Sequence, residues 1–221
     1  MILTKNARFY SSSTKLNDVY ILSAARTPIG SFQNSLASLS ATQLGAIALE
    51  SAIERACLTK DEIKEIYMGS VLQGGVGQAP ARQVALFAGL PKSTICTTVN
   101  KVCASGMKSI MLGCQSLMTN AQEVVAAGGM ESMSNVPYYL KRGKTPYGGV
   151  SLTDGILFDG LTDVYDKIHM GICAESCASK HGIDRAAQDA YAVESYKRSA
   201  ASYKKGVFQN ELTKITIKQR G

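Results

Sequence analysis

Long hydrophobic runs are missing from this sequence. No apolar stretch reaches the ~20 residues that a membrane-spanning helix requires, because glycine, serine and charged residues interrupt each one. Hydrophobic residues still make up 45% of the 221 residues, which is enough to bury a sizeable core. We therefore expect a soluble, globular protein without a membrane partner.

Paired cysteine motifs are also missing. The six cysteines lack the CxxC spacing of zinc ribbons, and a chain of this length does not depend on disulfides. Cys173 and Cys177 stand four residues apart on a helical pattern and could face one metal ion. Burial as small apolar side chains is the favoured interpretation, because no second pair matches them. We expect reduced thiols.

A phosphate-binding glycine loop is absent as well. Residues 73–80 (QGGVGQAP) are rich in glycine but lack the Gly-Lys-Ser/Thr ending of a P-loop. Their glycines do not match the dinucleotide-binding fingerprint either. The segment is predicted to be a tight loop between core elements.

Acidic residues are absent from the first 17 positions, which carry Lys5, Arg8, Lys15 and several hydroxyl side chains. This composition is typical of a mitochondrial presequence, and no apolar segment of the length of a secretory signal is present. We predict a mitochondrial presequence over residues 1–17. An untargeted tail on a cytoplasmic protein is the alternative.

The net charge of +7 is concentrated at the two ends of the chain. Residues 180–221 carry nine basic side chains and four acidic ones. Such a segment either forms a solvated helix face or attracts nucleic acid or a phosphorylated small molecule.

Predicted strands and helices alternate over the first 130 residues. Ser40 and Gln43 form a capping-box pattern that opens a helix, and Thr59 with Glu62 repeats the pattern. Because a right-handed crossover connects successive strands, we expect a parallel sheet of βαβ units. The apolar strand segments are 19–24, 66–71, 95–99 and 123–131, and those at 95–99 and 123–131 are predicted to be buried. The helix at 81–89 ends at a glycine.

One cysteine stands where the 95–99 strand gives way to a helix. Met107, Ile110 and Met111 recur at helical spacing, which places Cys103 at a helix N-terminus. Unpaired N–H groups and the helix dipole stabilise an anion there, which favours the reactive thiolate. Cys103 is the candidate nucleophile, and a small buried hydrophobe is the alternative.

Residues 134–221 are predicted to be a loop or lid domain that follows a core half at 18–133. Periodicity is lost from 134 to about 166, where Gly, Pro, Tyr and Asp accumulate. Helices are predicted at 168–182 and 184–206, followed by a half-exposed strand at 212–217.

Five motifs spread along the chain identify a family. In this order they resemble the N-terminal part of the thiolases, specifically the short-chain acetyl-CoA acetyltransferases (acetoacetyl-CoA thiolases) of the mitochondrial type. The motifs are ARTPIG (25–30), QGGVGQ (73–78), NKVCASG (100–106), GGMESMS (128–134) and KIHMG (167–171).

The resemblance implies an α/β fold of two βαβαβαββ halves in a five-layered arrangement. This chain would hold the N-terminal half, with a loop domain inserted near residues 134–221. It also implies that Cys103 accepts acetyl from acetyl-CoA and that a second acetyl-CoA attacks this thioester to give acetoacetyl-CoA. The backbone N–H of Cys103 would donate to the oxyanion. Coenzyme A thioesters are implied as substrates, with no organic cofactor and no nucleic acid.

The resemblance also implies roles for residues after 134. His169 and Met170 resemble positions that line the coenzyme A channel, so His169 is not the base. Tyr196 resembles a tyrosine involved in potassium and coenzyme A binding. Taken by themselves, His169 and Tyr196 fit packing roles as well. Residues 145–150 resemble a loop through which such enzymes associate, so we expect a homo-oligomer, a dimer of dimers.

Three motifs of the family do not occur in this sequence. They are Asn-Glu-Ala-Phe, Gly-His-Pro and Cys-x-Gly-Gly, which the resemblance assigns to a C-terminal half that is absent here. We therefore expect the isolated chain to have little or no turnover and to expose apolar helix surface. Two alternatives stay open: a non-catalytic piece that associates with full-length thiolase subunits, and a Cys–His hydrolase that uses Cys103 and His169.

Overall fold

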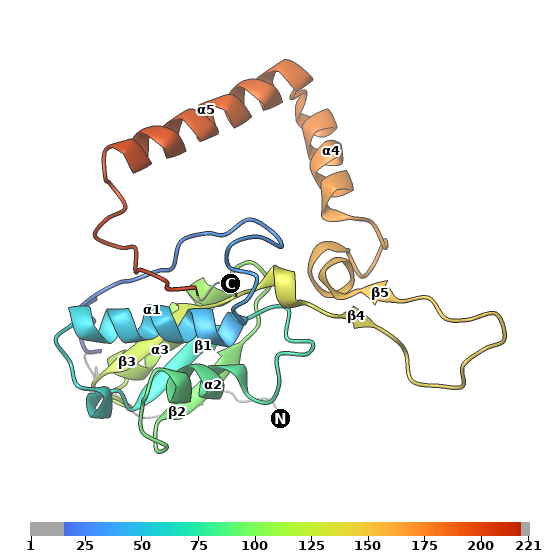
Figure 1. Cartoon of the computed structure of the whole chain (residues 1–221). Helices are drawn as coiled ribbons and strands as arrows, with labels where there is room; N and C mark the ends of the chain where they lie inside the picture. The colour runs from blue at the N-terminus through green and yellow to red at the C-terminus, as the bar shows by residue number, and fades with distance from the viewer. Residues whose placement is uncertain (1–15, 218–221) are drawn as a thin grey trace, which may run out of the picture.

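A parallel three-stranded sheet lies at the centre of the computed structural model, which describes residues 16–217 (Figure 1). The strands are β1 (Glu65–Gly69), β2 (Ile95–Val99) and β3 (Val125–Gly129), in the order β2-β1-β3. Both outer strands run parallel to β1, and Glu65 is opposite Ile95 and Val125. The predicted parallel sheet is thus confirmed. The predicted presequence lies outside the described residues except for its last two positions.

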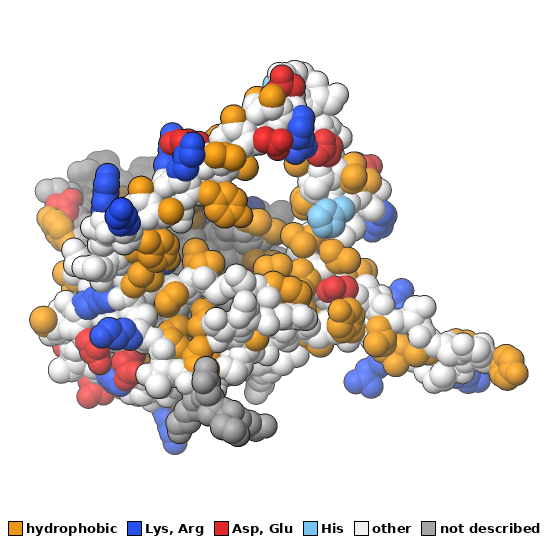
Figure 2. Space-filling view, turned by 45° about the horizontal axis from the view of Figure 1, so that its top comes forward, with side chains coloured by type: hydrophobic (Ala, Val, Ile, Leu, Met, Phe, Trp, Pro, Cys, Tyr) orange, Lys and Arg blue, Asp and Glu red, His pale blue; other side chains and the backbone are white. Residues whose placement is uncertain are grey.

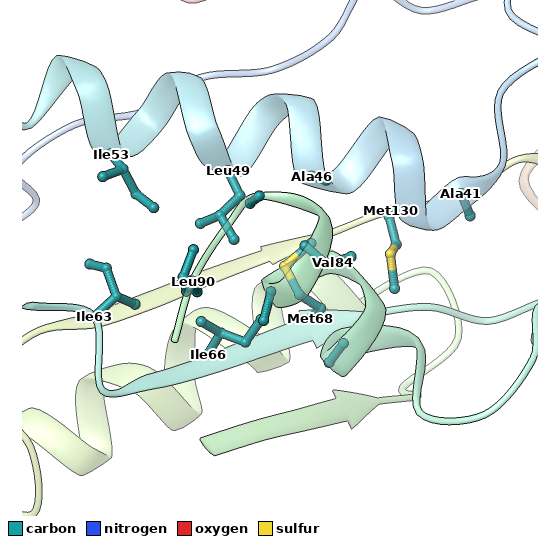
Figure 3. Packing of buried hydrophobic residues seen from close by; sticks show 13 residues of the cluster. Ala41, Ala46, Leu49, Ile53, Ile63, Ile66, Met68, Val84, Leu90 and Met130 are labelled. Carbon is teal, nitrogen blue, oxygen red and sulfur yellow. The ribbon is translucent and has the colours of Figure 1, made fainter. Parts of the chain in front are cut away.

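The hydrophobic core fills the space between β1 and two helices on one face of the sheet, α1 (Ala41–Arg55) and α2 (Pro80–Phe87). Figure 3 shows Ile66 and Met68 of β1 directed toward Leu49 of α1 and Val84 of α2. Burying such a side chain contributes about 1.5–3 kcal/mol. This cluster is therefore the main source of stability on this face of the sheet.

Local capping signals set where α1 and the short 3₁₀ helix η1 (Lys60–Glu62) begin. The Ser40 hydroxyl accepts a hydrogen bond from Gln43 N–H at 3.2 Å, and the Gln43 side chain accepts one from Ser40 N–H at 2.9 Å. Thr59 and Glu62 form the second box. Both predicted boxes are confirmed.

Helix α3 (Ser105–Met118) packs on the opposite face of the sheet through small residues. Its buried positions are Ser105, Ser109, Gly113 and Ser116, and a Cβ on Gly113 would meet the Val125 side chain at 3.3 Å. The predicted apolar stripe points the other way, since Met107 is 67% exposed and Ile110 and Met111 are half exposed. The expected exposure of apolar helix surface is thus confirmed for α3.

Most of the chain after residue 133 extends away from this core, and its end returns to the last residue of α1, where Arg55 contacts Asn210 and Leu212 (Figures 1 and 2). Ile156 is the only buried hydrophobic side chain in the described residues beyond 133, so the region is held by few apolar contacts. A loop at 140–152 projects outward between β4 and β5. The elements are η2 (Met133–Asn135), β4 (Tyr138–Tyr139) antiparallel to β5 (Thr153–Asp154), the π-helix η3 (Leu157–Leu161), α4 (Met170–His181) and α5 (Arg185–Lys204).

The two long helices of this region begin and end within two residues of the predicted bounds, 168–182 and 184–206. The Asp184 carboxylate accepts a hydrogen bond from Ala187 N–H at 2.8 Å, and Gly206 takes a φ of 70° just after α5. Neither α4 nor α5 contains a buried residue. We call residues 163–211, which include both helices, the arm.

The predicted strands at 19–24 and 212–217 are wrong for this structure. Only an isolated bridge joins Arg26 to Leu212, and Ile21 is 85% exposed. A strand is stabilised by hydrogen bonds to a neighbouring strand, and neither segment has such a neighbour among the described residues. The predicted βαβαβαββ order therefore appears with three of its five sheet strands.

Two predictions of burial are also wrong. Strands β2 and β3 are only half buried because each lies at an edge of the sheet, and Ile95 is exposed. Cys177 is exposed and Cys173 half exposed, because α4 packs against no other layer. All six cysteines are unpaired thiols, as predicted. Between residues 16 and 217, no helix has the length and apolar character to cross a membrane.

Candidate functional site

The candidate nucleophile lies at the carboxyl end of β2, which is the edge of a parallel sheet where ligands commonly bind. Cys103 is exposed and stands two residues before the first residue of α3. The predicted position at a helix N-terminus is therefore confirmed. Its catalytic role is the subject of the proposal below.

Two side chains hold the turn that carries Cys103. Asn100 Oδ1 accepts a hydrogen bond from Val102 N–H at 2.9 Å, and Asn100 Nδ2 donates to Val71 O at 3.4 Å. The Ser105 hydroxyl accepts from Lys101 N–H at 2.8 Å and donates to Val102 O. These bonds connect the turn to β1's exit loop and to the first residue of α3.

The turn stores backbone strain next to the thiol. Val102 has a φ of 50°, in the left-handed region that β-branched residues rarely occupy. Such a conformation costs on the order of 1–3 kcal/mol and persists only where the surroundings enforce it. The strain directly precedes Cys103, which is a pattern common at functional sites.

Glycines let α3 begin very close to the sheet. A Cβ on Gly69 would lie 2.6 Å from the backbone nitrogen of Gly106, and a Cβ on Gly129 would lie 3.3 Å from Gly106 Cα. The Glu131 carboxylate also fixes the loop after β1, since it accepts hydrogen bonds from Val71 N–H at 2.9 Å and Leu72 N–H at 3.1 Å.

The start of α3 offers hydrogen-bond donors near the thiol. Within the described residues, the N–H groups of Cys103, Gly106 and Met107 make no backbone hydrogen bond, whereas those of Ala104 and Ser105 close the turn. Such N–H groups at the positive end of a helix favour an anion. The site thus combines an exposed thiol with donors able to stabilise an oxyanion.

The other predicted site residues lie on the arm. His169 caps α4, and its Nδ1 accepts a hydrogen bond from Gly171 N–H at 2.9 Å. Met170 is the first residue of α4 and is exposed, and Tyr196 is 80% exposed on α5. In the described part of the chain, no hydrogen bond joins any of the three to Cys103, so the structure does not bring them together by direct contact.

One tyrosine does not by itself make a potassium site. A hard cation takes six or more oxygen ligands, and Tyr196 offers one hydroxyl at an exposed position. No cluster of three His, Cys, Asp or Glu side chains suited to a metal occurs between residues 16 and 217. Potassium binding at Tyr196 stays a prediction, and no chemical step is assigned to it.

A hollow of about 320 Å³ lies away from these residues, between the start of α1, α2 and η2. Its polar lining is uncharged and includes Thr42, Gln83 and Asn135. These side chains already bond to one another or to backbone carbonyls. The hollow contains none of the predicted site residues.

A tyrosine at the base of the projecting hairpin has a strongly shifted pKa. Tyr139 donates to Asp159 Oδ2 at 2.6 Å, and this hydrogen bond to a carboxylate, helped by partial burial, raises the pKa of Tyr139 to about 12. A Cβ on Gly74 would overlap the Tyr139 ring. The hydroxyl of Tyr139 therefore joins β4 to η3, while its ring packs against the loop after β1.

The sequence predicted the position of Cys103 at the start of α3 but not the contacts that hold its turn. The contact between Gly69 and Gly106 and the left-handed Val102 were not predicted. A glycine at the end of a strand is a signal of close backbone approach, and Gly69 and Gly129 carry that signal.

Comparisons with known proteins agree with this arrangement. The family model of the thiolase N-terminal domain matches residues 19–221. The mitochondrial acetyl-CoA acetyltransferases of Rattus norvegicus and Homo sapiens are 63% and 61% identical to this chain over 214 residues, which is 97% of this chain and 50% of each relative. The chain thus spans about half the length of the curated relatives it matches.

A solved structure shares the fold. The crystal structure of Acat5 thiolase from Ascaris suum in complex with coenzyme A matches with a TM-score of 0.89 and 44% identity, over 91% of this chain and 53% of that one. The parallel strands and the cysteine turn at the start of α3 are consistent with the family match over nearly the whole length. The chain therefore belongs to the thiolase family.

Proposed function

We propose that this chain provides the nucleophile of an acetyl-CoA acetyltransferase and that Cys103 is the acetyl acceptor. The observation that carries the proposal is the exposed thiol on a strained turn, followed directly by the N–H groups that begin α3. The names of the relatives and the coenzyme A complex of the solved neighbour support the substrate class.

The first half-reaction uses groups of this chain. The Cys103 thiolate attacks the acetyl carbonyl carbon of acetyl-CoA, and the carbon–sulfur bond to coenzyme A breaks so that its thiolate leaves. The N–H groups of Cys103 and Gly106, which have no backbone acceptor among the described residues, would donate to the oxyanion that forms between these events. The product is an acetyl thioester on Cys103.

The second half-reaction forms the carbon–carbon bond. A second acetyl-CoA loses a methyl proton to a base, and its carbanion attacks the Cys103 thioester, which releases acetoacetyl-CoA and regenerates the thiolate. The thiol of Cys103 makes no hydrogen bond to a histidine or carboxylate in the described chain. We assign the base to the C-terminal half implied by the resemblance, and we propose little or no turnover without it.

Coenzyme A would lie between the core and the arm. His169, Met170 and Tyr196 are the proposed contacts, and the basic side chains of α5 would attract its phosphates. The relatives reported above are mitochondrial, which supports a mitochondrial location and gives no support to a cytoplasmic one. Association through residues 145–150, which include the fully exposed Tyr147, is the proposed route to a homo-oligomer.

A non-catalytic piece that associates with full-length thiolase subunits is the second candidate. The exposed Met107, Ile110 and Met111 of α3 favour it, since a contiguous apolar helix face is typical of an interface. Co-purification with a full-length thiolase, without acetylation of Cys103, would support this candidate over the first.

A Cys–His hydrolase has less support. The Nδ1 of His169 already accepts a hydrogen bond from Gly171 N–H at the start of α4. Among the described residues, no hydrogen bond links His169 to Cys103.

The experiment compares acetylation among the six cysteines of one chain. After incubation with acetyl-CoA, peptide mass spectrometry should find the acetyl adduct first on Cys103. Cys57 and Cys177 are also exposed and serve as internal controls for simple accessibility. Labelling of all three at similar rates would refute the proposal, as would an adduct that persists elsewhere after Cys103→Ala.

A further inference from the structure

We propose that Arg26 and Arg55 are positioning residues that fix the rotation and placement of α5, and through it the coenzyme A contact at Tyr196. This inference rests on the proposed function. It concerns two guanidinium groups of the core that hold the end of the arm, neither of which belongs to the cysteine turn.

Arg55 joins three backbone carbonyls from two distant segments. It is the last residue of α1, and its Nη1 donates to Ala24 O at 3.1 Å and to Asn210 O at 2.6 Å. Its Nη2 donates to Leu212 O at 2.7 Å. The planar guanidinium can serve three acceptors at once, which a lysine ammonium on a flexible stem does not do with the same geometry.

Arg26 contacts the same end of the arm, at Glu211. Its Nη2 and Nε lie 2.7 and 2.8 Å from Glu211 Oε1, and two backbone hydrogen bonds, from Arg26 N–H to Glu211 O and from Thr213 N–H to Arg26 O, run alongside. The guanidinium also lies over the Phe208 ring at 5.1 Å. Arg26 therefore fixes the backbone and a side chain at the end of the arm.

Phe208 links Arg26 to α5. Its ring packs edge-on against Tyr203 with centroids 5.0 Å apart, and Tyr203 lies in the last turn of α5. Tyr196 precedes Tyr203 by seven residues, which is two helical turns, so both side chains leave the same side of the helix. Holding Tyr203 thus sets the direction in which Tyr196 faces.

The arm has few other constraints on its placement. No residue of α4 or α5 is buried, so neither helix is fixed by packing against the core. The other end of the arm follows η3, which the hydrogen bond from Tyr139 to Asp159 joins to β4. Contacts at the two ends must therefore determine where the helices lie.

The test uses charge-conserving variants, Arg26→Lys and Arg55→Lys, with Phe208→Leu as a variant that removes the ring. Arg82→Lys is the matched control, because the Arg82 guanidinium also donates to two carbonyls, Thr94 O and Lys92 O, but does so between α2 and β2. The first readout is hydrogen exchange of the amides at 207–213. The second is the dependence of Cys103 acetylation on acetyl-CoA concentration.

We expect amide exchange at 207–213 to become about tenfold faster in Arg26→Lys and Arg55→Lys, and to change less than about twofold in Arg82→Lys. The acetyl-CoA concentration that gives half-maximal acetylation should rise about five- to tenfold, while the limiting rate stays within about twofold. A general loss of folding would lower the limiting rate instead. Phe208→Leu should shift the half-maximal concentration in the same direction.

Unchanged exchange at 207–213 in both lysine variants overturns the inference, even if Cys103 is acetylated normally. Faster exchange with an unchanged half-maximal concentration also overturns it, because the arm would then be loosened without effect on coenzyme A. Failure of the unsubstituted chain to acetylate Cys103 would instead refute the proposed function, and the exchange rates would still decide whether the two arginines hold the arm.

Discussion

Replacing Gly69 by alanine tests whether the contact between the sheet and the start of α3 holds the cysteine turn. The added Cβ would lie 2.6 Å from Gly106 N and from Ser105 C, and both are backbone atoms that cannot rotate away. Ordinary contact begins near 3.4 Å, so the start of α3 would have to move by about 0.8 Å, the difference between the two distances.

The energetic consequences follow from two opposing terms. Overpacking costs about 1–3 kcal/mol. Restricting the unfolded chain by replacing glycine with alanine returns only about 0.4–1 kcal/mol. We expect a net destabilisation of about 1–2 kcal/mol from these two terms. Because a misplacement of about 1 Å can cost about 10²-fold in rate, acetylation of Cys103 should slow by up to that factor.

Urea unfolding and the rate of Cys103 acetylation measure the two effects. Gly128→Ala is the matched control, since its Cβ would meet only the Met68 side chain at 3.6 Å, an ordinary contact in the neighbouring strand. That variant should be as stable as the parent or slightly more so, with an unchanged rate. Equal stability and equal acetylation rates in the two variants would contradict the reasoning.

Three further outcomes are expected. Ser40→Ala removes one half of the capping box and should lower the free energy of unfolding by about 1 kcal/mol, which urea denaturation measures, whereas Ser40→Asn should restore most of it. Absorbance at 295 nm should show Tyr139 titrating at about 12, and Asp159→Asn should move the midpoint down toward about 10. Since this pKa is raised on folding, the pair's contribution to stability is complete below pH ~10 and is lost as the pH rises through about 12. His169→Ala should speed hydrogen exchange at Gly171, and an unchanged rate there would show that the cap of α4 does not form in solution.

Local features of the fold were predictable because their causes lie within a few residues. The capping box at Ser40, the N-cap at Asp184 and the glycine after α5 depend on side chains three or four positions from the helix ends they define. The strand-to-helix switch that places Cys103 is equally local. These features appear in the structure where the sequence indicates them.

Exposure was harder to predict because it depends on neighbours that no local pattern specifies. Residues 19–24 have the composition of a core strand, yet only Arg26, just beyond them, forms a single bridge to Leu212. The apolar stripe of α3 was predicted as a helical pattern, but the sequence did not indicate that small serines and Gly113 would face the sheet. The side of a helix that packs against the sheet depends on the shape of the sheet surface, which the helix sequence does not specify.

The sequence by itself determined the order of the three sheet strands and their helices, the ends of those helices to within about two residues, and the place of one cysteine at a helix N-terminus, since each follows from short-range hydrogen bonding and periodicity. Only the tertiary structure decided that Gly69 touches Gly106 and that Arg26 meets Glu211, 185 residues away. Contacts between distant residues depend on how strands are ordered and how the chain returns, and those are properties of the whole fold.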